Sequence, residues 1–393
     1  MTILFIHSGA DLYGASRSLL RLGTRLVLEG NQVVVLLPYD GPLHEALVSS
    51  GIVVLIDSTL AIVTRRRMRH WWGVFALLVE IPRSIHSLRK VIRRFRPDIV
   101  HTNTAIVLAS GIAAWLEGLP HIWHVREFFA EFGWLWRVYQ WFMFMFASRL
   151  VCVSEAVRGQ FVTFIRRRKT CAIHDGIPRS EFGPVSKDRV NQFRAKFKLE
   201  NNIIVGVVGR LKMVRKGQDT FLRAAALLVK DYPQVQFVLI GSHFPGNENH
   251  LVALVDLGRA LGIDDRVVYT GEVPDIKAAY AALDVSVLPS EQPEPFGGVV
   301  IESMASAKPV IGTRVGGTCE QIEDQKTGLL VPPGDPQALA RAIRSLLDDQ
   351  SLRHKLGEAG RKRFEQMFEF EQFFEQMKWV YSQAINSRLV RRV

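Results

Sequence analysis

The chain has 393 residues, of which 48% are hydrophobic and 22% are charged, and its formal net charge is +12 at pH 7. This length suggests two or three domains, and this composition is typical of a globular protein, which excludes a disordered chain. The three cysteines, Cys152, Cys171 and Cys319, are widely spaced and form no metal-ligand pattern, so we expect a reducing compartment and no disulfide framework.

The N-terminus does not have the pattern of a targeting segment. The first residues, MTILFIHSGADLYG, lack a basic region, and His7 and Asp11 interrupt their short apolar run. Uninterrupted apolar stretches of about 18 residues, which a membrane span requires, are not found either. We therefore expect a cytoplasmic protein without a signal peptide or membrane span.

In the first half of the chain, short apolar strands alternate with helical patterns. The predicted strands are 3–6, 33–37, 52–56, 99–101, 121–125, 150–153 and 170–173, and the predicted helices are 15–29, 42–50, 105–117 and 134–146. This alternation predicts a parallel, doubly wound sheet. The pattern breaks at 179–188, RSEFGPVSKD, which we interpret as a linker.

A basic segment, residues 61–100, interrupts this first alternation. It holds two acidic residues and ten basic ones, a net charge of +8, and the basic residues are Arg65, Arg66, Arg67, Arg69, Arg83, Arg89, Lys90, Arg93, Arg94 and Arg96. Beside them lies an apolar block that includes Trp71, Trp72 and Phe75. Arginine next to tryptophan suits a membrane interface, so we predict peripheral binding to the anionic inner face of the plasma membrane and no nucleic-acid partner. The alternative is a basic surface helix whose core face is formed by Ile85, Leu88, Ile92 and Phe95.

A second alternation follows the linker. The predicted strands are 203–208, 236–240, 267–269, 285–288 and 309–312, and the predicted helices are 218–230, 250–261, 276–283, one beginning near Gly297, and others from Pro336 onward. The whole chain is therefore predicted to be α/β, with two Rossmann-like, doubly wound domains at 1–183 and 184–368 and a C-terminal helix within 369–393. In such domains, ligands bind beyond the carboxyl ends of the strands.

The stretch from Pro289 to Val310 carries the clearest pattern for a ligand site. Glu294 and Glu302 flank an aromatic-Gly-Gly turn, Phe296 to Gly298, at the expected start of a helix. The free N–H groups of that helix would attract phosphate, and ionised carboxylates accept hydrogen bonds from sugar hydroxyls. The pattern predicts a sugar-nucleotide site. The alternative is an ordinary surface carboxylate followed by a helix carboxylate.

Two further cations follow the strand at 203–208. Arg210 and Lys216 can converge on a diphosphate, the arginine as a planar fork and the lysine as a point charge. No D-x-D motif is present to hold a divalent cation, so we predict no metal site and charge stabilisation by these side chains instead. The missing G-x-G-x-x-G after the first strand argues against a dinucleotide oxidoreductase.

The stretch at 294–309 resembles the E-x7-E signature of retaining glycosyltransferases of family 4, usually E-P-F-G-x-x-x-x-E-x-M-A-x-G-x-P. It matches at Glu294, Pro295, Phe296, Gly297, Glu302, Met304, Ala305 and Pro309. It departs at Ala307, where the family usually has a glycine that ends the helix in the left-handed conformation. Alanine there should cost about 1 kcal/mol or shift the helix end.

The resemblance implies the GT-B fold, in which two Rossmann-like domains face a cleft and the C-terminal helix packs back on the first domain. It implies donor binding by a set of residues in the second domain: Arg210, Lys216, Val273, Glu294, Phe296, Gly297, Gly298 and Glu302. Arg210 and Lys216 would stabilise the leaving group, Glu294 would hold the sugar hydroxyls, and Glu302 the ribose. His124 would lie near the reacting sugar and, with Gly14, on the acceptor side. The family's glycine loop often has two adjacent glycines, whereas here Tyr13 precedes Gly14.

The resulting hypothesis is a retaining, metal-independent hexosyltransferase without a cofactor. It would move a sugar from a nucleotide-diphosphate sugar to a lipid-linked glycan or polysaccharide acceptor. One alternative is a sugar-nucleotide epimerase or hydrolase on the same fold. A catalytically silent, membrane-bound scaffold is another, which the joint presence of Arg210, Lys216, Glu294 and Glu302 disfavours.

Overall fold

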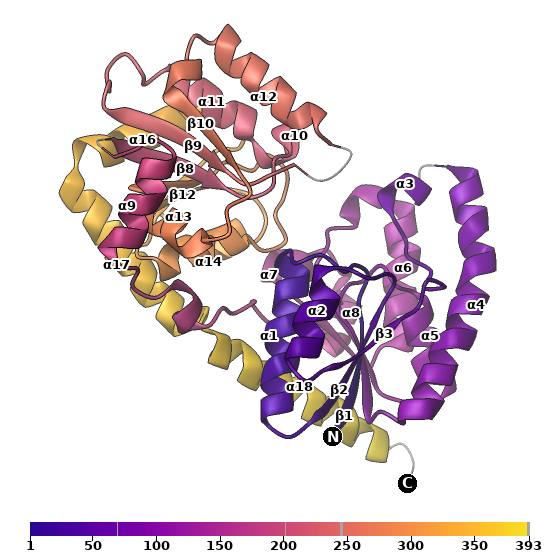
Figure 1. Ribbon diagram of the computed structural model, residues 1–393. Coiled ribbons are helices and arrows are strands. Elements are labelled where there is room, and N and C mark those ends of the chain that lie inside the picture. The colour runs from indigo at the N-terminus through magenta and orange to yellow at the C-terminus, as the bar shows by residue number, and fades with distance from the viewer. Residues whose placement is uncertain (69, 201, 244–246, 391–393) are drawn as a thin grey trace. The chain divides into compact units, whose positions relative to one another are not determined.

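The computed structural model describes residues 1–68, 70–200, 202–243 and 247–390, which form two compact units (Figure 1). Unit 1 comprises Met1–Gly176 together with the C-terminal segment from Glu371, and unit 2 comprises Ile177–Phe370. The predicted domain boundaries at 183/184 and 368/369 lie close to these divisions. The segment after Gly176 nevertheless belongs to unit 2, and the C-terminal helix belongs to unit 1.

Unit 1 is built on a seven-stranded parallel sheet in the order β3-β2-β1-β4-β5-β6-β7. Its strands are β1 Thr2–Ile6, β2 Gln32–Leu37, β3 Val53–Ile56, β4 Ile99–Thr102, β5 His121–Val125, β6 Arg149–Cys152 and β7 Thr170–Ala172. Its helices are α1 Gly14–Leu28, α2 Pro42–Ser49, α3 Arg65–Met68, α4 Trp71–Phe95, α5 Ala109–Leu116, η1 Ala130–Phe132, α6 Trp134–Phe146, α7 Glu155–Gly159, α8 Thr163–Lys169 and α18 Phe370–Val390. Because β1 pairs with both β2 and β4, the chain winds outward from β1 in two directions, which confirms the predicted doubly wound topology.

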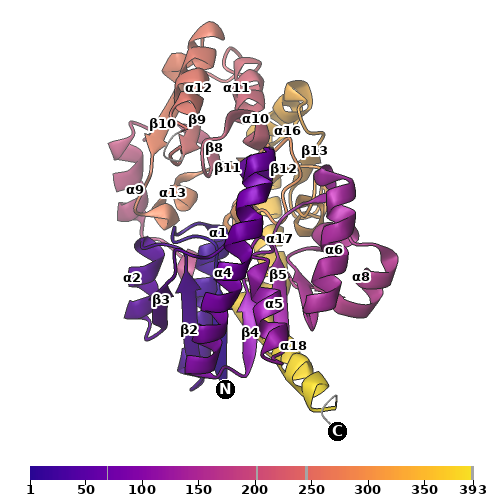
Figure 2. The same cartoon turned by 90° about the vertical axis from the view of Figure 1, so that its right-hand side faces the viewer.

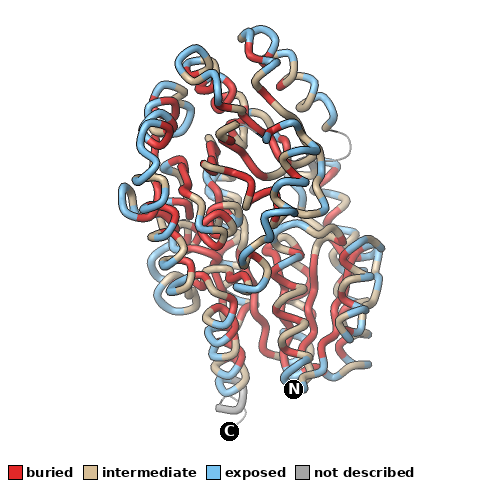
Figure 3. The backbone as a smooth tube through the Cα atoms, turned by 60° about the vertical axis from the view of Figure 1, so that its left-hand side comes forward, coloured by how far each residue is buried: buried red, intermediate tan, exposed pale blue. Residues whose placement is uncertain are grey.

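Unit 2 repeats this plan with six parallel strands in the order β10-β9-β8-β11-β12-β13. Its strands are β8 Ile203–Val208, β9 Val235–Ile240, β10 Val267–Gly271, β11 Val285–Leu288, β12 Val310–Thr313 and β13 Leu329–Val331. Its helices are η2 Arg179–Phe182, α9 Lys187–Lys196, α10 Met213–Lys216, α11 Gln218–Ala226, α12 Asn249–Ala260, η3 Asp264–Arg266, α13 Ile276–Ala282, α14 Gly298–Ala305, α15 Thr318–Gln321, α16 Pro336–Asp348 and α17 Gln350–Met367. The inner strands of both sheets are buried because helices cover both faces of a parallel sheet, and Figure 3 shows buried backbone in the interior of each unit.

The segment 179–188, which we interpreted as a linker, is folded as part of unit 2. The segment contains η2 and the start of α9, and Ser186 caps α9 by accepting a hydrogen bond from the backbone N–H of Arg189. Just before it, Ile177 pairs with the backbone around Glu369, which fixes the segment in unit 2. The side chains of Phe182 and Phe193 are buried in the core of that unit. The proline, glycine and charged residues of this segment are typical of linkers, which is why the sequence did not predict its packing.

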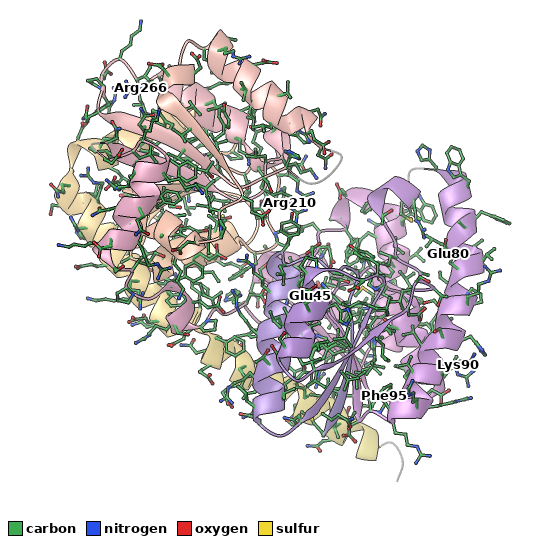
Figure 4. The ribbon with its side chains drawn as sticks, viewed as in Figure 1. Glu45, Glu80, Lys90, Phe95, Arg210 and Arg266 are labelled. Carbon is green, nitrogen blue, oxygen red and sulfur yellow. The ribbon has the colours of Figure 1, made fainter. Side chains whose placement is uncertain are left out.

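The basic segment folds into α3 and the long helix α4, which continues through Pro82. The interpretation as a surface helix with a core face is confirmed, because Leu88 and Ile92 are buried and Ile85 and Phe95 pack against the same core. Trp72 and Phe75 are exposed, and the membrane interpretation stays a prediction. Figure 4 labels Glu80, Lys90 and Phe95 along α4. Arg69 and the side chains of Arg65, Arg66 and Trp71 lie outside the described residues.

Part of the positive charge of the basic segment is paired within unit 1. Arg67 forms an ion pair with Glu80 at 2.5 Å, and Arg89 and Arg93 both approach Glu117, at 2.6 Å and 3.0 Å. These hydrogen bonds hold the pKa of Glu117 below its ordinary value. Glu80 is already included in the +8 of the sequence count, whereas Glu117 lies outside residues 61–100 and lowers the net charge of this surface by one.

Helix α14 ends as the sequence predicts. Ala307 has a φ of +54°, and the backbone N–H groups of Ala307 and Lys308 donate to the carbonyls of Met304 and Ser303 at 3.0 Å and 2.9 Å. This is a Schellman motif, whose left-handed residue is usually glycine. Ala307 therefore adopts the left-handed conformation that the family's glycine has, and the cost of about 1 kcal/mol stays a prediction.

We expect Ala307→Gly to stabilise unit 2 by about 1 kcal/mol, because the exposed methyl group has few contacts to lose and the strain of the left-handed conformation is removed. The thermal unfolding midpoint should rise by about 2–4 °C. Ser306→Gly is the matched control, since Ser306 has a φ of −90° and should gain nothing. A midpoint of Ala307→Gly at or below that of the parent would contradict the argument.

Candidate functional site

The predicted donor residues other than Val273 follow the carboxyl ends of two neighbouring strands of unit 2. Strands β8 and β11 pair in parallel at the point where the strand order reverses. Gly209 and Arg210 follow β8, and Pro289 and Ser290 follow β11, and Figure 4 labels Arg210 just beyond its strand. This is the position where open α/β sheets bind ligands.

The loop after β8 is closed by one glutamine and by one close backbone contact. The Gln218 side chain donates to the carbonyl of Arg210 at 2.9 Å and accepts from the N–H of Lys212 at 3.0 Å. Gly217 has a φ of +63°, and a Cβ atom there would lie 1.8 Å from the carbonyl oxygen of Pro289. The two loops are therefore in backbone contact beside Lys216.

Lys216 and Glu294, which belong to different motifs of the predicted donor site, form an ion pair. Nζ of Lys216 lies 2.5 Å from Oε1 of Glu294, which also accepts a hydrogen bond from the Ser290 hydroxyl at 2.8 Å. The Glu294 side chain is 9% exposed and that of Lys216 is 30% exposed. Burial alone would raise the pKa of Glu294, but Lys216, Ser290 and Arg215 outweigh it and hold that pKa below its ordinary value. The site thus contains an ionised, buried carboxylate with an adjacent cation.

The backbone that carries Glu294 is fixed from a third strand. Its carbonyl oxygen accepts from the N–H of Gly317 at 2.8 Å. Gly316 has a φ of +52°, and a Cβ atom there would lie 2.2 Å from the same oxygen. The Thr313 hydroxyl, at the end of β12, donates to the carbonyl of Ser290 at 2.5 Å. These contacts preorganise the carboxylate on the end of the sheet.

Helix α14 follows this carboxylate in the chain; Gly297 is its N-cap, which agrees with the predicted start near Gly297. Its N-cap makes no side-chain hydrogen bond, and its first turn contains no acidic residue, so its first N–H groups are not capped by its own side chains. One turn into the helix, Oε2 of Glu302 accepts from the hydroxyl of the buried Tyr280 at 2.6 Å. The arrangement combines an anion-attracting helix end with a carboxylate fixed through one oxygen.

The remaining donor residues are placed around these two features. Phe296 packs on Phe368 with ring centroids 5.9 Å apart, and Gly297 accepts from the Gln321 side chain at 3.0 Å. Gly298 is the first residue of α14. Val273 follows β10 at the edge of the sheet and is partly buried against the core. The structure brings Lys216 and Glu294 into contact. Val273 lies apart from them, because β9 separates its strand, β10, from β8.

Sequence reasoning missed several residues that shape this site: Ser290, Gln218, Tyr280 and Thr313. Ser290 lies four residues before Glu294, and this proximity was a signal that could have been used. The pairing of Tyr280 with Glu302 depends on how α13 packs, for which the sequence has no local signal.

In unit 1, His124 lies in a buried polar cluster at the end of β5. Its ring stacks between His101 and Phe373, with centroids 5.6 Å and 6.3 Å away, and its Nδ1 lies 3.4 Å from Nη2 of Arg126. Burial and the nearby Arg126 lower the pKa of His124 well below its ordinary value, so that the ring is neutral. Nδ1 is then the acceptor, and Nε2 carries the proton without a hydrogen-bond partner among the described residues. The predicted role of His124 beside the sugar stays a prediction.

Arg126 is itself held by two polar side chains. It forms an ion pair with Asp175 and donates from Nη2 to the Ser18 hydroxyl at 2.8 Å, and Ser18 donates to Asp175 at 2.8 Å. Gly14, a predicted acceptor residue, is the first residue of α1, and a Cβ atom there would meet none of the described residues within 4 Å. Packing within the chain therefore does not require glycine at position 14.

Glu127 lies next to this cluster, and burial raises its pKa to about 7. Its carboxylate accepts hydrogen bonds from the backbone N–H groups of Arg126 and Ala105, which lower the pKa by less than burial raises it. Since its ordinary value is 4.5, the folded state binds this proton more tightly than the unfolded state. The resulting stabilisation is complete below pH 4.5 and is lost as the pH rises through about 7.

We therefore expect Glu127→Gln to gain stability relative to the parent as the pH rises from 4.5 to 7, by about 3 kcal/mol at most, and to keep that gain above pH 7. Thermal unfolding of both proteins across this range measures the difference. Glu131→Gln, at an exposed site on the same segment, should show no such trend. A difference that is constant with pH would show that Glu127 has no raised pKa.

Comparison with known proteins gives matches over most of the chain. Residues 188–363 match the family model described as Glycosyl transferases group 1, and residues 13–181 match the model described as Glycosyltransferase Family 4. The chain is 32% identical over 259 residues to the D-inositol 3-phosphate glycosyltransferase of Salinispora tropica, an alignment that covers 62% of this chain and 53% of that protein. It is 28% identical over 318 residues to the capsular polysaccharide biosynthesis glycosyltransferase CapM of Staphylococcus aureus, covering 76% and 81%. The chain spans about half the length of the D-inositol 3-phosphate glycosyltransferases that it matches.

Solved structures share the fold over nearly the whole chain. Anabaena Alr3699/HepE in complex with UDP-glucose matches with a TM-score of 0.81 and 25% identity, covering 97% of this chain and 99% of that one. Sucrose-phosphate synthase from Thermosynechococcus elongatus matches with a TM-score of 0.77 and 24% identity, covering 98% and 100%. These matches confirm the predicted GT-B fold of two Rossmann-like domains.

Proposed function

Because the chain belongs to glycosyltransferase family 4, we propose that it transfers a sugar from a nucleotide-diphosphate sugar to an acceptor hydroxyl, with retention of configuration and without a metal ion. The observation that carries this proposal is the Lys216–Glu294 ion pair beside the uncapped start of α14. A cation, a helix N-terminus and a buried carboxylate at one strand end suit a ligand that combines phosphates with hydroxyls. The resemblance to a protein solved with UDP-glucose supports the same ligand class.

In the proposed donor complex, Arg210, Lys216 and the N–H groups of α14 stabilise the negative charge that develops on the diphosphate as it leaves. Glu294 accepts hydrogen bonds from hydroxyls of the transferred sugar. Tyr280 occupies only Oε2 of Glu302, so Oε1, which lies beside Gly298, is the oxygen that would accept from the ribose. Phe296, Gly297 and Val273 complete the donor site through packing and backbone groups.

On the acceptor side, the proposal assigns Gly14 and the neutral His124. The acceptor hydroxyl attacks the sugar carbon from the side of the leaving diphosphate, the carbon–phosphate oxygen bond breaks, and a phosphate oxygen takes the hydroxyl proton. Neutral His124 carries its proton on Nε2 and would donate it as a hydrogen bond to the sugar.

The acceptor is proposed to be a lipid-linked glycan or a polysaccharide at the inner face of the plasma membrane. The exposed Trp72 and Phe75 on α4, among basic residues, support membrane proximity. The resemblance to CapM supports an acceptor of the polysaccharide class. Among the described residues, no helix is both long and apolar enough to cross a bilayer.

A panel of nucleotide sugars that includes UDP-glucose tests the proposal. We expect one donor to raise the thermal unfolding midpoint, because a ligand that binds only the folded state stabilises it. Nucleotide release from that donor should require an acceptor and should persist in excess chelator. Release of free sugar without an acceptor would identify a hydrolase, and failure of every donor to shift the midpoint would refute the proposed donor site.

A further inference from the structure

Helix α6 is apolar on two opposite sides. Trp136, Gln140 and Met143 are buried against unit 1, as expected for the inner side of a surface helix. The opposite side is also apolar but exposed, and its residues follow the spacing i, i+4, i+7, i+11: Trp134 71%, Val138 61%, Trp141 45% and Met145 65% exposed. A helix that is apolar all round is normally buried, so this outer stripe lacks the cover that its composition requires.

The stripe continues onto α8, which lies beside α6 (Figure 2). The ring of Phe164 on α8 lies 5.7 Å from that of Trp141 and 5.5 Å from that of Phe144. Phe164 is 44% exposed, and Val162, just before α8, is also exposed. Together these residues form one continuous surface, which we call the α6–α8 face: Trp134, Val138, Trp141, Met145, Val162 and Phe164.

Basic residues border the α6–α8 face. Helix α8 ends in four of them, Arg166 to Lys169, while neither α6 nor α8 contains an acidic residue. The guanidinium of Arg168 lies 4.5 Å from the centroid of the Phe164 ring, so that charge and apolar surface adjoin directly. Lys169 is used internally, because it donates to the carbonyls of Phe144 and Ala147 at the end of α6. Arg137, Arg167 and Arg168 are exposed at the border.

We propose that the α6–α8 face docks on an anionic lipid bilayer, with the indoles in the headgroup region and the arginines on lipid phosphates. A protein partner complementary to this face would need acidic side chains placed around an apolar centre. A bilayer supplies the same charge as a continuous plane, next to apolar chains at the depth where tryptophan partitions. Helix α6, 13 residues long, suits a helix that lies in the interface plane. The inference rests on the proposed function only for the statement that docking brings the enzyme to a lipid-linked acceptor.

The test is co-sedimentation of the full chain with vesicles of phosphatidylglycerol and phosphatidylcholine, compared with phosphatidylcholine alone, at low and high salt. The parent should bind the anionic vesicles at low salt and release at high salt, because salt screens the arginines. Trp134→Ser combined with Trp141→Ser, and separately Arg167→Ser combined with Arg168→Ser, should each weaken binding by about tenfold or more. Trp379→Ser, which removes an exposed tryptophan from α18, is the matched control and should bind like the parent.

Three results would overturn the inference. The parent could fail to bind anionic vesicles at low salt. The α6–α8 variants could bind like the parent while only Trp72→Ser with Phe75→Ser loses binding, which would assign docking to α4. Light scattering could show a dimer that the tryptophan variant converts to a monomer, which would make a second copy of the chain the partner. The donor-induced thermal shift is recorded in parallel, so that failure of the donor site is distinguished from failure of docking.

Discussion

Lys216→Ala is expected to lower turnover by about a hundredfold, the usual effect of removing one preorganised charge from a site where negative charge develops. The Nζ atom of Lys216 lies 2.5 Å from Oε1 of Glu294. The leaving diphosphate is proposed to bind next to this pair, at the start of α14. The loss should appear in kcat, because the leaving-group charge is greater in the transition state than in the bound donor. Lys230→Ala, an exposed lysine beyond α11, is the control that should retain full turnover.

Lys216 has two possible roles, to keep Glu294 ionised or to contact the diphosphate. Comparison of Lys216→Ala, Glu294→Gln and the double variant separates them, because coupled residues deviate from additivity. If Lys216 acts only through Glu294, the double variant should turn over no more slowly than Glu294→Gln. If it contacts the donor, the double variant should lose a further factor of about ten or more. Turnover of Lys216→Ala within about twofold of the parent would remove Lys216 from the site.

Gly217→Ala is expected to cause the largest loss of stability, at least about 3 kcal/mol. The added Cβ atom would lie 1.8 Å from the carbonyl oxygen of Pro289, and backbone on both sides must then move. The φ of +63° adds the strain of a left-handed alanine, about 1–2 kcal/mol. Urea unfolding of unit 2 measures the loss. Turnover should fall as well, because the displaced loop leads directly to Ser290 and Glu294.

Gly262→Ala is a close control for this substitution. Gly262 has a φ of +67° in the same unit, but a Cβ atom there would lie more than 4 Å from the part of the chain that the structure describes. It should therefore show only the conformational strain, without the clash. Equal losses in the two variants would show that the loops at 217 and 289 separate at little cost, and that their contact does not hold the site together.

The sequence predicts elements well where one local pattern decides the outcome. Helix α6 and strand β11 have the predicted bounds because each is a mostly apolar run. Gly133 precedes the helix, and Asp284 and Pro289 flank the strand. Helix α9 was missed because a Pro- and Gly-containing segment before it suggested a linker. The continuation of α4 through Pro82 likewise overrides the local preference of proline to end a helix.

For the site, the sequence predicts several of the residues but not the hydrogen bonds that orient them. Resemblance to a known signature identified Glu294 and Lys216 as members of one site, although 78 positions separate them. It did not identify the hydroxyls of Ser290 and Tyr280 that orient the two glutamates. Such partners are chosen by the packing of neighbouring helices and loops, which short sequence patterns do not encode. For the same reason, the outer stripe of α6 could be recognised only once its inner side was known.

The place of α18 in unit 1 has a consequence for the order in which the chain matures during translation. Its side chains Phe374, Met377, Val380 and Tyr381 are buried, and Tyr381 hydrogen-bonds His101 on β4 at 2.7 Å, across 280 positions. The ribosome synthesises α18 only after all of unit 2. The apolar surface of unit 1 that α18 covers therefore stays exposed while unit 2 is synthesised. The unit that begins first is therefore completed last. Because Ile177 pairs with the backbone around Glu369, folding of unit 2 brings together the two chain ends that lead into unit 1, so that α18 then docks without closing a long flexible loop.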